Sequence, residues 1–168
     1  MHPSWSTLRP RVLAAAGLPL LLAFHAAPAG AQGAAVSGAY VTRLGSDTVA
    51  VEEFTRTADS IRGRQVVRVP RTQIREYSGA LRPDGTLSSF AIAFRMPDSP
   101  QPAMRGTVEF GADSATVRLT RGDSTQTFRI AAGPGAMPLV AYSVGLYELW
   151  LARAGGAGVN SLRPGLVP

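Results

Sequence analysis

Residues 73–96 read QIREYSGALRPDGTLSSFAIAFRM, and this stretch decides the fold class of the chain. Phe90, Ile92 and Phe94 recur at every second position, which is the spacing of side chains on one face of a β-strand. The preceding tripeptide 83–85 has turn chemistry, because its proline presets φ, its aspartate binds its own backbone and its glycine accepts a positive φ. The stretch is therefore predicted to be a β-hairpin.

The same alternation continues on both sides of this hairpin. It predicts eight strands, at 39–44, 48–56, 61–69, 73–82, 87–96, 103–110, 115–121 and 125–131. Their short connections imply antiparallel pairing of consecutive strands. We therefore expect a mainly β fold, an antiparallel up-and-down meander that forms either a curved sheet or a barrel.

A helix is predicted to follow the strands over 139–154, with Pro138 near its first turn and Gly155-Gly156 after its end. Its apolar positions at helical spacing are Leu139, Tyr142, Leu146 and Trp150. Such an apolar helix needs a partner surface, which we expect to be the sheet. The predicted domain thus spans 38–154, and 155–168 is expected to form an irregular tail.

The N-terminal segment 1–31 has the three parts of a secretory signal peptide. Arg9 and Arg11 supply the positive start, 12–24 is apolar, and Ala29-Gly30-Ala31 is a small-x-small cleavage pattern. An apolar run of this length is shorter than the roughly 20 residues of a transmembrane helix. We therefore expect a secreted or periplasmic protein of the bacterial cell envelope, with no stable membrane insertion after cleavage.

The predicted mature chain begins near Gln32 with a flexible segment, 32–37, and lacks three catalytic residue types. The sequence has no cysteine and no lysine, and its two histidines, His2 and His25, both lie in the predicted signal peptide. Ser-His-Asp and Cys-His nucleophiles, standard zinc sites, Walker A loops and pyridoxal Schiff bases are thereby excluded. We expect a non-enzymatic protein without a cofactor or a metal.

From residue 32 onward the chain has fifteen arginines and eleven acidic residues, a net charge of +4. Arg62, Arg64 and Arg68 share one face of a predicted strand. They predict either an anion-binding stripe or an ordinary solvated strand face. No aromatic residues alternate with these arginines, so nucleic acid is not an expected partner.

The sequence also predicts an apolar interior. Its larger aromatic members are Tyr77, Phe90, Phe94, Phe110, Phe128 and Trp150. These side chains either fill a core or line a cavity for a hydrophobic small molecule. At the level of fold alone, a curved antiparallel sheet with helices resembles the periplasmic lipoprotein carriers of the LolA type, which favours a lipid-like ligand.

Three functional hypotheses remain from the sequence. The first is an exported binding or carrier protein for a lipid-like ligand. The second is a structural or interaction module of the envelope that uses the Arg-rich strand face. The third is a hydrolase with a carboxylate pair drawn from Glu53, Glu76 and Glu109. The sequence predicts no oligomeric state.

Overall fold

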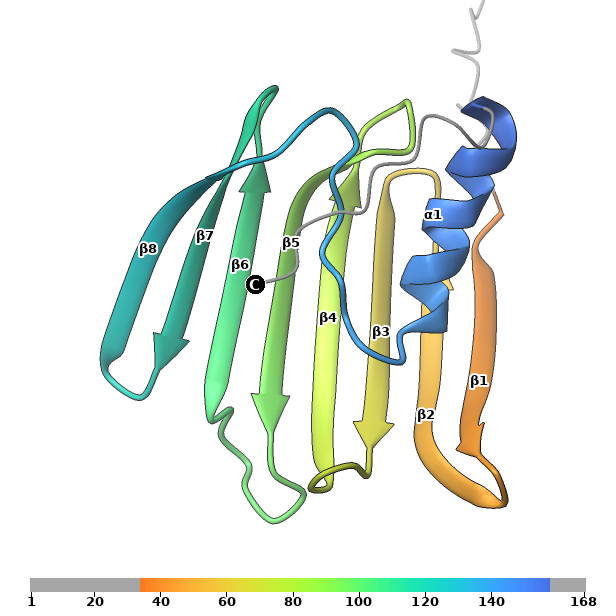
Figure 1. Ribbon diagram of the computed structural model, residues 1–168, viewed down its shortest axis with the longest axis vertical. Coiled ribbons are helices and arrows are strands. Elements are labelled where there is room, and N and C mark those ends of the chain that lie inside the picture. Colours follow the sequence, from red (N-terminus) through yellow and green to blue (C-terminus); the bar gives the residue numbers. More distant parts are fainter. Residues whose placement is uncertain (1–33, 158–168) are drawn as a thin grey trace, which may run out of the picture. The chain divides into compact units, whose positions relative to one another are not determined.

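The structure is a computed structural model that describes residues 34–157. These residues form one sheet followed by one helix (Figure 1). The elements are β1 (Val36–Leu44), β2 (Asp47–Arg56), β3 (Ser60–Val67), β4 (Gln73–Leu81), β5 (Leu87–Arg95), β6 (Met104–Phe110), β7 (Ser114–Arg121), β8 (Ser124–Ala131) and α1 (Val144–Ala157). Each strand pairs antiparallel with the next, in the order β1 to β8. The predicted eight-strand meander is confirmed.

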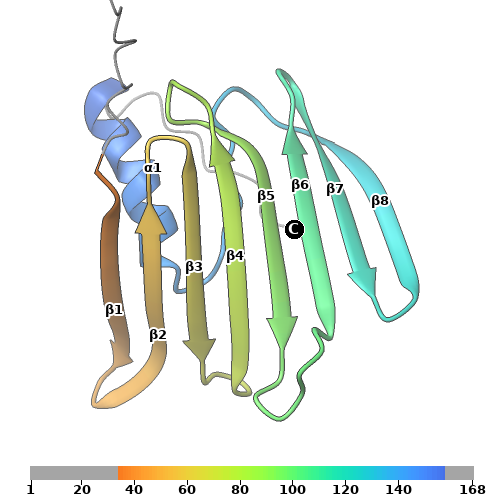
Figure 2. The ribbon, with the colours of Figure 1, turned by 180° about the vertical axis from the view of Figure 1, so that it is seen from behind.

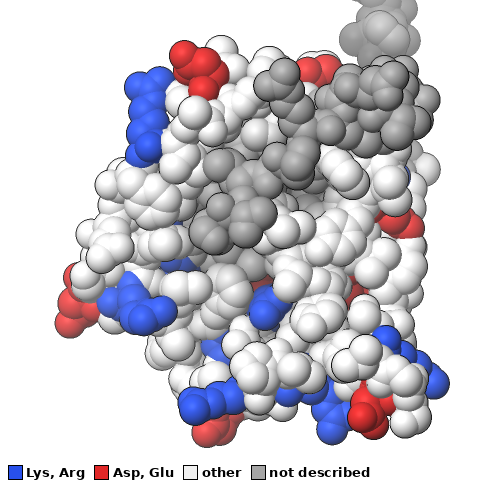
Figure 3. Space-filling model, in the orientation of Figure 1, with Lys and Arg blue, Asp and Glu red and all other residues white. Residues whose placement is uncertain are grey.

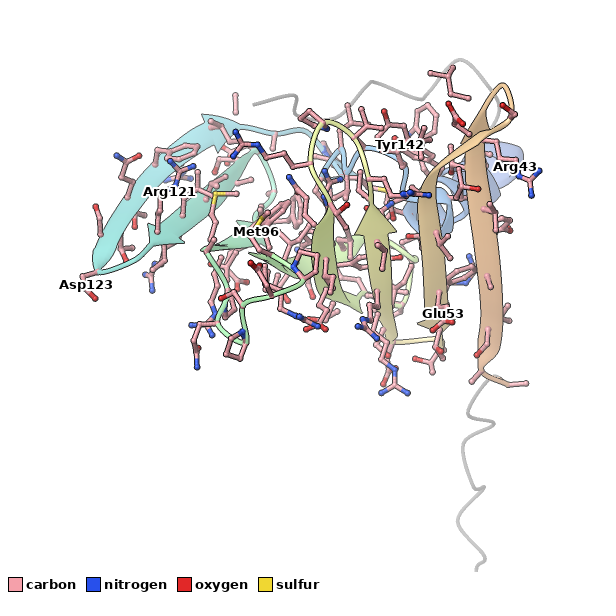
Figure 4. The ribbon with its side chains drawn as sticks, turned by 90° about the horizontal axis from the view of Figure 1, so that it is seen from below. Arg43, Glu53, Met96, Arg121, Asp123 and Tyr142 are labelled. Atoms are coloured by element: carbon pink, nitrogen blue, oxygen red, sulfur yellow. The ribbon has the colours of Figure 1, made fainter. Side chains whose placement is uncertain are left out.

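The sheet is curved and it does not close into a barrel. Within the described chain, β1 and β8 are the two edges and do not pair with each other. Figure 4, which looks along the strands, shows the curvature, and Figure 2 shows that α1 lies on one side only. The curved-sheet alternative is therefore the correct one, because the helix and the segment before it occupy the concave side.

Tight turns with glycine connect several of the strands. Gly45, Gly85 and Gly122 have φ values of 61°, 76° and 56° at the β1–β2, β4–β5 and β7–β8 turns. In the turn after β4, an Asp84 carboxylate oxygen accepts the backbone N–H of Thr86 at 2.8 Å. These local contacts fix the register of the hairpins.

Glycines on the concave face make room for two aromatic rings. Gly38 is paired with Phe54 across β1 and β2, and Gly63 is paired with Tyr77 across β3 and β4. A Cβ at Gly38 would lie 2.5 Å from Phe54 Cε1, and a Cβ at Gly145 of α1 would lie 2.7 Å from Phe54 Cγ. The two rings therefore lie flat over backbone and allow α1 to approach the sheet closely.

The buried core lies between the concave face and the two segments that cover it, α1 and the chain between β8 and α1. It includes Ile61, Tyr77, Leu87 and Phe90 from the sheet, and Leu146 and Leu149 from the helix. Trp150 is partly buried against this cluster. Burial of these side chains is the main stabilising term available to a chain without disulfides.

The helix begins at Val144, five residues later than the predicted start at Leu139. Tyr142 has φ 66°, a left-handed conformation that is incompatible with a helix interior. The Ser143 carbonyl instead accepts a hydrogen bond from the N–H of Tyr147 at 3.2 Å, and the helix begins there. The apolar spacing that suggested an earlier start belongs to the chain that precedes α1.

That preceding chain, residues 132–143, is named the crossing segment. It runs from β8 across the concave side of the sheet to the start of α1 (Figure 1). Pro138 lies in this segment and not in the first helical turn. The crossing segment therefore covers part of the sheet that the helix leaves uncovered.

Both ends of the predicted domain need correction. The predicted flexible segment 32–37 is too long, because β1 begins at Val36 and pairs with the end of β2. The predicted tail 155–168 begins too early, because α1 continues through both glycines to Ala157. The predicted signal peptide 1–31 and the rest of the tail lie outside the described residues.

Candidate ligand-binding site

A buried carboxylate on β2 fixes the start of α1. Glu52 is 1% exposed, and it accepts hydrogen bonds from Tyr77 Oη at 2.7 Å, Ser143 Oγ at 2.5 Å and the Gly145 N–H at 3.0 Å. Burial raises the pKa of the Tyr77 hydroxyl, and the nearby Glu52 adds to this rise, so the hydroxyl remains a donor. Glu52 thus supplies negative charge and an acceptor where the helix has unpaired N–H groups.

A second set of polar contacts holds the crossing segment above β3 and β4. The fully buried Gln65 donates from Nε2 to the Ala141 carbonyl at 3.3 Å. Arg75 donates from Nη1 to the same carbonyl at 3.0 Å and to Gln65 Oε1 at 3.4 Å. Its Nε also donates to Gln73 Oε1 at 3.2 Å. The crossing segment is therefore fixed at Ala141 by two side chains of the sheet.

Between the crossing segment and strands β4 to β8 lies a cavity of about 440 Å³. Its lining residues are Arg75, Ile92, Phe94, Met104, Gly106, Val108, Phe110, Val117, Leu119, Phe128, Ile130, Pro138, Leu139, Val140 and Ala141. Arg75 is the only ionisable residue among them. On the face that bears α1, basic and acidic side chains lie mostly toward the rim (Figure 3). The volume lies in the range of roughly 300–1,000 Å³ that is typical of small-molecule sites.

Arg75 is partly buried at the β4 end of this cavity. Its guanidinium lies over the Phe94 ring, with Cζ 5.6 Å from the centroid. Burial lowers the pKa of Arg75, and the electrostatic effect of Tyr142 opposes this. Since arginine remains charged in proteins, Arg75 is the one cation among the described residues that line this apolar cavity. No Asp or Glu of the described residues forms an ion pair with it.

The six aromatic residues predicted to form the interior lie in the core, in the cavity lining, or in both. Tyr77 and Phe90 are buried in the core cluster, and Trp150 packs against that cluster. Phe94 and Phe128 line the cavity, and Phe110 belongs to both the cluster and the lining. Both interpretations of this aromatic set, a filled core and a cavity, therefore apply, and the two regions meet at Phe110.

The three arginines predicted as an anion-binding stripe do not line the cavity. Arg62 and Arg64 lie on the convex face of β3, and Arg68 is exposed beyond its end. Arg62 and Arg64 line a shallow, open depression of about 620 Å³ together with Glu53. Arg68 is not part of this depression. Arg64 Nε lies 3.8 Å from Glu76 Oε1. The two neighbouring acids reduce the attraction that this surface offers to an anion.

The three candidate catalytic glutamates are exposed on the convex face. Arg64 lies between Glu53 and Glu76 in one cross-strand row, and Glu109 lies on β6. Glu53 points away from the side that carries Tyr142 (Figure 4). None of the three lines the cavity, and the described residues contain no group of three potential metal ligands.

Arg75 and the crossing segment are parts of the site that were not predicted from the sequence. The signal for Arg75 was present, because it precedes Tyr77 by two residues and so shares its face in a strand. No comparable signal existed for residues 138–141, whose apolar spacing fits a helix. Their place over the cavity depends on contacts with Gln65 and Arg75, which are distant in the sequence.

The described chain is thus an open antiparallel meander with one C-terminal helix and an apolar cavity on its concave side. No protein-family model, no curated protein and no solved structure matches it. Among the described helices, none has the length and apolar character needed to cross a membrane.

Proposed function

We propose that this protein is an exported, non-enzymatic binding or carrier protein of the cell envelope for a lipid-like apolar ligand. The observation that carries the proposal is the cavity of about 440 Å³ on the concave side of β4 to β8. Fourteen of its fifteen lining residues have no charge. An apolar chain is the ligand chemistry that such a lining favours.

Burial of apolar groups is the main source of binding free energy that this cavity offers to such a ligand. Each buried methylene contributes about 0.8 kcal/mol, so about ten methylenes supply roughly 8 kcal/mol. This corresponds to a dissociation constant of about 1 μM before the entropic cost of association is subtracted. The proposal therefore expects a ligand with a long alkyl chain or several rings.

The residue chemistry supports binding over catalysis. From residue 32 onward the sequence has no histidine, cysteine or lysine, and the described residues that line the cavity include no carboxylate. The hypothesis of an interaction module that uses the Arg-rich strand face has less support, because Arg64 is paired with Glu76 and lies opposite Glu53. The carboxylate-pair hypothesis has less support still, since Glu53, Glu76 and Glu109 are exposed and lie outside the cavity.

The proposal is tested with the neutral fluorescent probe N-phenylnaphthylamine. We expect saturable binding at one site, measured by the rise in probe fluorescence. Phe128 and Leu139 line the cavity and are 40% and 52% exposed, so replacing both with serine leaves the fold intact. The double variant is expected to bind the probe about tenfold more weakly, because the serines remove apolar contact area.

A matched pair of substitutions outside the cavity serves as the control. Val41 and Leu44 are 57% and 75% exposed on β1, and Val41→Ser with Leu44→Ser is expected to leave probe affinity unchanged. Absence of saturable binding, or equal losses in the two double variants, would contradict the proposed function.

A further inference from the structure

We infer that the ligand is a single-chain amphiphile with an anionic head group, and that Arg75 binds this head group at the β4 end of the cavity. The inference rests on the proposed binding function. It adds the chemical class of the ligand and the orientation in which it binds.

The hydrogen bonds of Arg75 leave one edge of the guanidinium available. A guanidinium has five N–H donors. Nε donates to Gln73, and Nη1 donates to Gln65 and Ala141. Both N–H groups of Nη2 find no acceptor among the described residues. These two donors can bind one or two oxygen atoms of an anion.

The guanidinium is held in place before any ligand binds. Gln65, which is fully buried, orients it through Oε1, and the Phe94 ring supports one face. A positioned donor loses little conformational freedom on binding, so more of the interaction energy appears as affinity. A partly buried cation without an acidic partner is also costly, and an anion relieves this cost.

The cavity provides a place for the tail of such a ligand. It extends from Arg75 on β4 to Phe128 and Ile130 on β8. Four interstrand spacings correspond to about 19 Å along the sheet. Because the described residues along this path include no second charged side chain, the charge of the ligand is expected at one end only. A cationic head group is disfavoured by repulsion from Arg75.

A series of ligands with the same twelve-carbon chain tests the inference without any substitution. Displacement of N-phenylnaphthylamine from the wild-type protein is measured for dodecanoate, dodecyl phosphate, dodecanol and dodecyltrimethylammonium. The three charged ligands are kept below their micellar concentrations, and dodecanol is kept below its solubility limit. We expect at least one of the two anions to bind about tenfold or more tightly than the alcohol, and the cation to bind most weakly. The ratio between dodecanoate and dodecyl phosphate distinguishes a carboxylate from a phosphate head group.

Arg75→Met then tests the assigned residue, with Arg95→Met as the matched control. Arg95 is a partly buried arginine on the adjacent strand, and it lies near Glu76 on the opposite face. Arg75→Met is expected to remove the preference for the anion, so that dodecanoate and dodecyl phosphate bind this variant no more tightly than dodecanol does. Arg95→Met is expected to retain the preference.

The outcomes separate this inference from the proposed function. Equal affinities for dodecanol and both anions in the wild-type protein would overturn the inference and leave the binding function in place. An anion preference that survives in a folded Arg75→Met variant would also overturn it. If neither the probe nor any of the four ligands binds, the proposed function itself fails. Should Arg75→Met not fold, the ligand series on the wild-type protein decides alone.

Discussion

Glu52 and Glu53 are adjacent in the sequence and lie in opposite environments. Glu52 points to the concave side, where three donors surround its carboxylate, whereas Glu53 is exposed on the convex face. The alternation of a strand produces this difference. At the scale of single residues, position in the strand therefore decides whether a glutamate is part of the core.

Glu52→Gln is expected to lower the free energy of unfolding by about 2 kcal/mol or more, because the buried donors lose a charged acceptor. The Gly145 N–H is affected most, since a backbone amide cannot reverse its role. Urea denaturation followed by circular dichroism measures the effect. The control Glu53→Gln is expected to stay within about 0.5 kcal/mol of the wild type. Equal losses in the two variants would show that Glu52 does not anchor the helix.

At the scale of elements, α1 depends on the sheet for both its start and its closest contact. Its start is capped by Glu52 of β2, and Tyr40 Oη of β1 donates a hydrogen bond to Glu148 in the helix. Gly145 allows the helix backbone to approach the rings of Phe54 and Tyr77. The helix and the first strands are thus expected to form one cooperative unit.

The close contact at Gly145 predicts a change in stability opposite to the one that helix propensity alone would give. Alanine favours a helix by about 1 kcal/mol over glycine. Gly145→Ala should nevertheless destabilise the protein by about 1–3 kcal/mol, because the new Cβ would lie 2.7 Å from Phe54 Cγ and 3.1 Å from Tyr77 Oη. Thermal denaturation provides the measurement.

Gly133→Ala is the control for this substitution. Gly133 lies in the crossing segment, and a Cβ there would meet no atom within 4 Å. We expect a change within about 0.5 kcal/mol. A Gly145→Ala variant as stable as the wild type would mean that α1 does not pack as closely as described.

At the scale of the whole molecule, the cavity exists because one helix covers only part of an eight-stranded sheet. Residues of α1 and of the crossing segment, such as Met137 and Val140, pack into the buried core, and a cavity remains between residues 138–141 and strands β4 to β8. The cavity would be of use in the envelope only if the chain is exported.

Export gives a prediction for the 168-residue chain. Expression of all 168 residues in a Gram-negative host should yield a periplasmic protein that begins at Gln32, as measured by intact mass. Ala29→Arg with Ala31→Arg is expected to block cleavage, because the small-x-small pattern is lost. Recovery of the uncleaved wild-type chain from the cytoplasm would contradict the predicted signal peptide.

Much of the fold was predictable because its interactions are local. Hairpins with turn residues such as Gly85 determine their own strands, and the predicted strand bounds differ from the observed ones by a few residues. The start of the helix was not predictable in this way. Tyr142 adopts a left-handed conformation next to residues held by Glu52 and Gln65, which are far away in the sequence.

The sequence by itself determined the antiparallel meander, the absence of histidine, cysteine and lysine after residue 31, and the aromatic residues available for an interior. Only the tertiary structure decided that the sheet remains open, and which of those aromatic residues line a cavity. It also placed Arg75 inside that cavity, whereas Arg62 and Arg64 remain on the outer face. The physical reason is that strand alternation is a local property, while the division between filled core and open space depends on how the chain after β8 packs across the sheet.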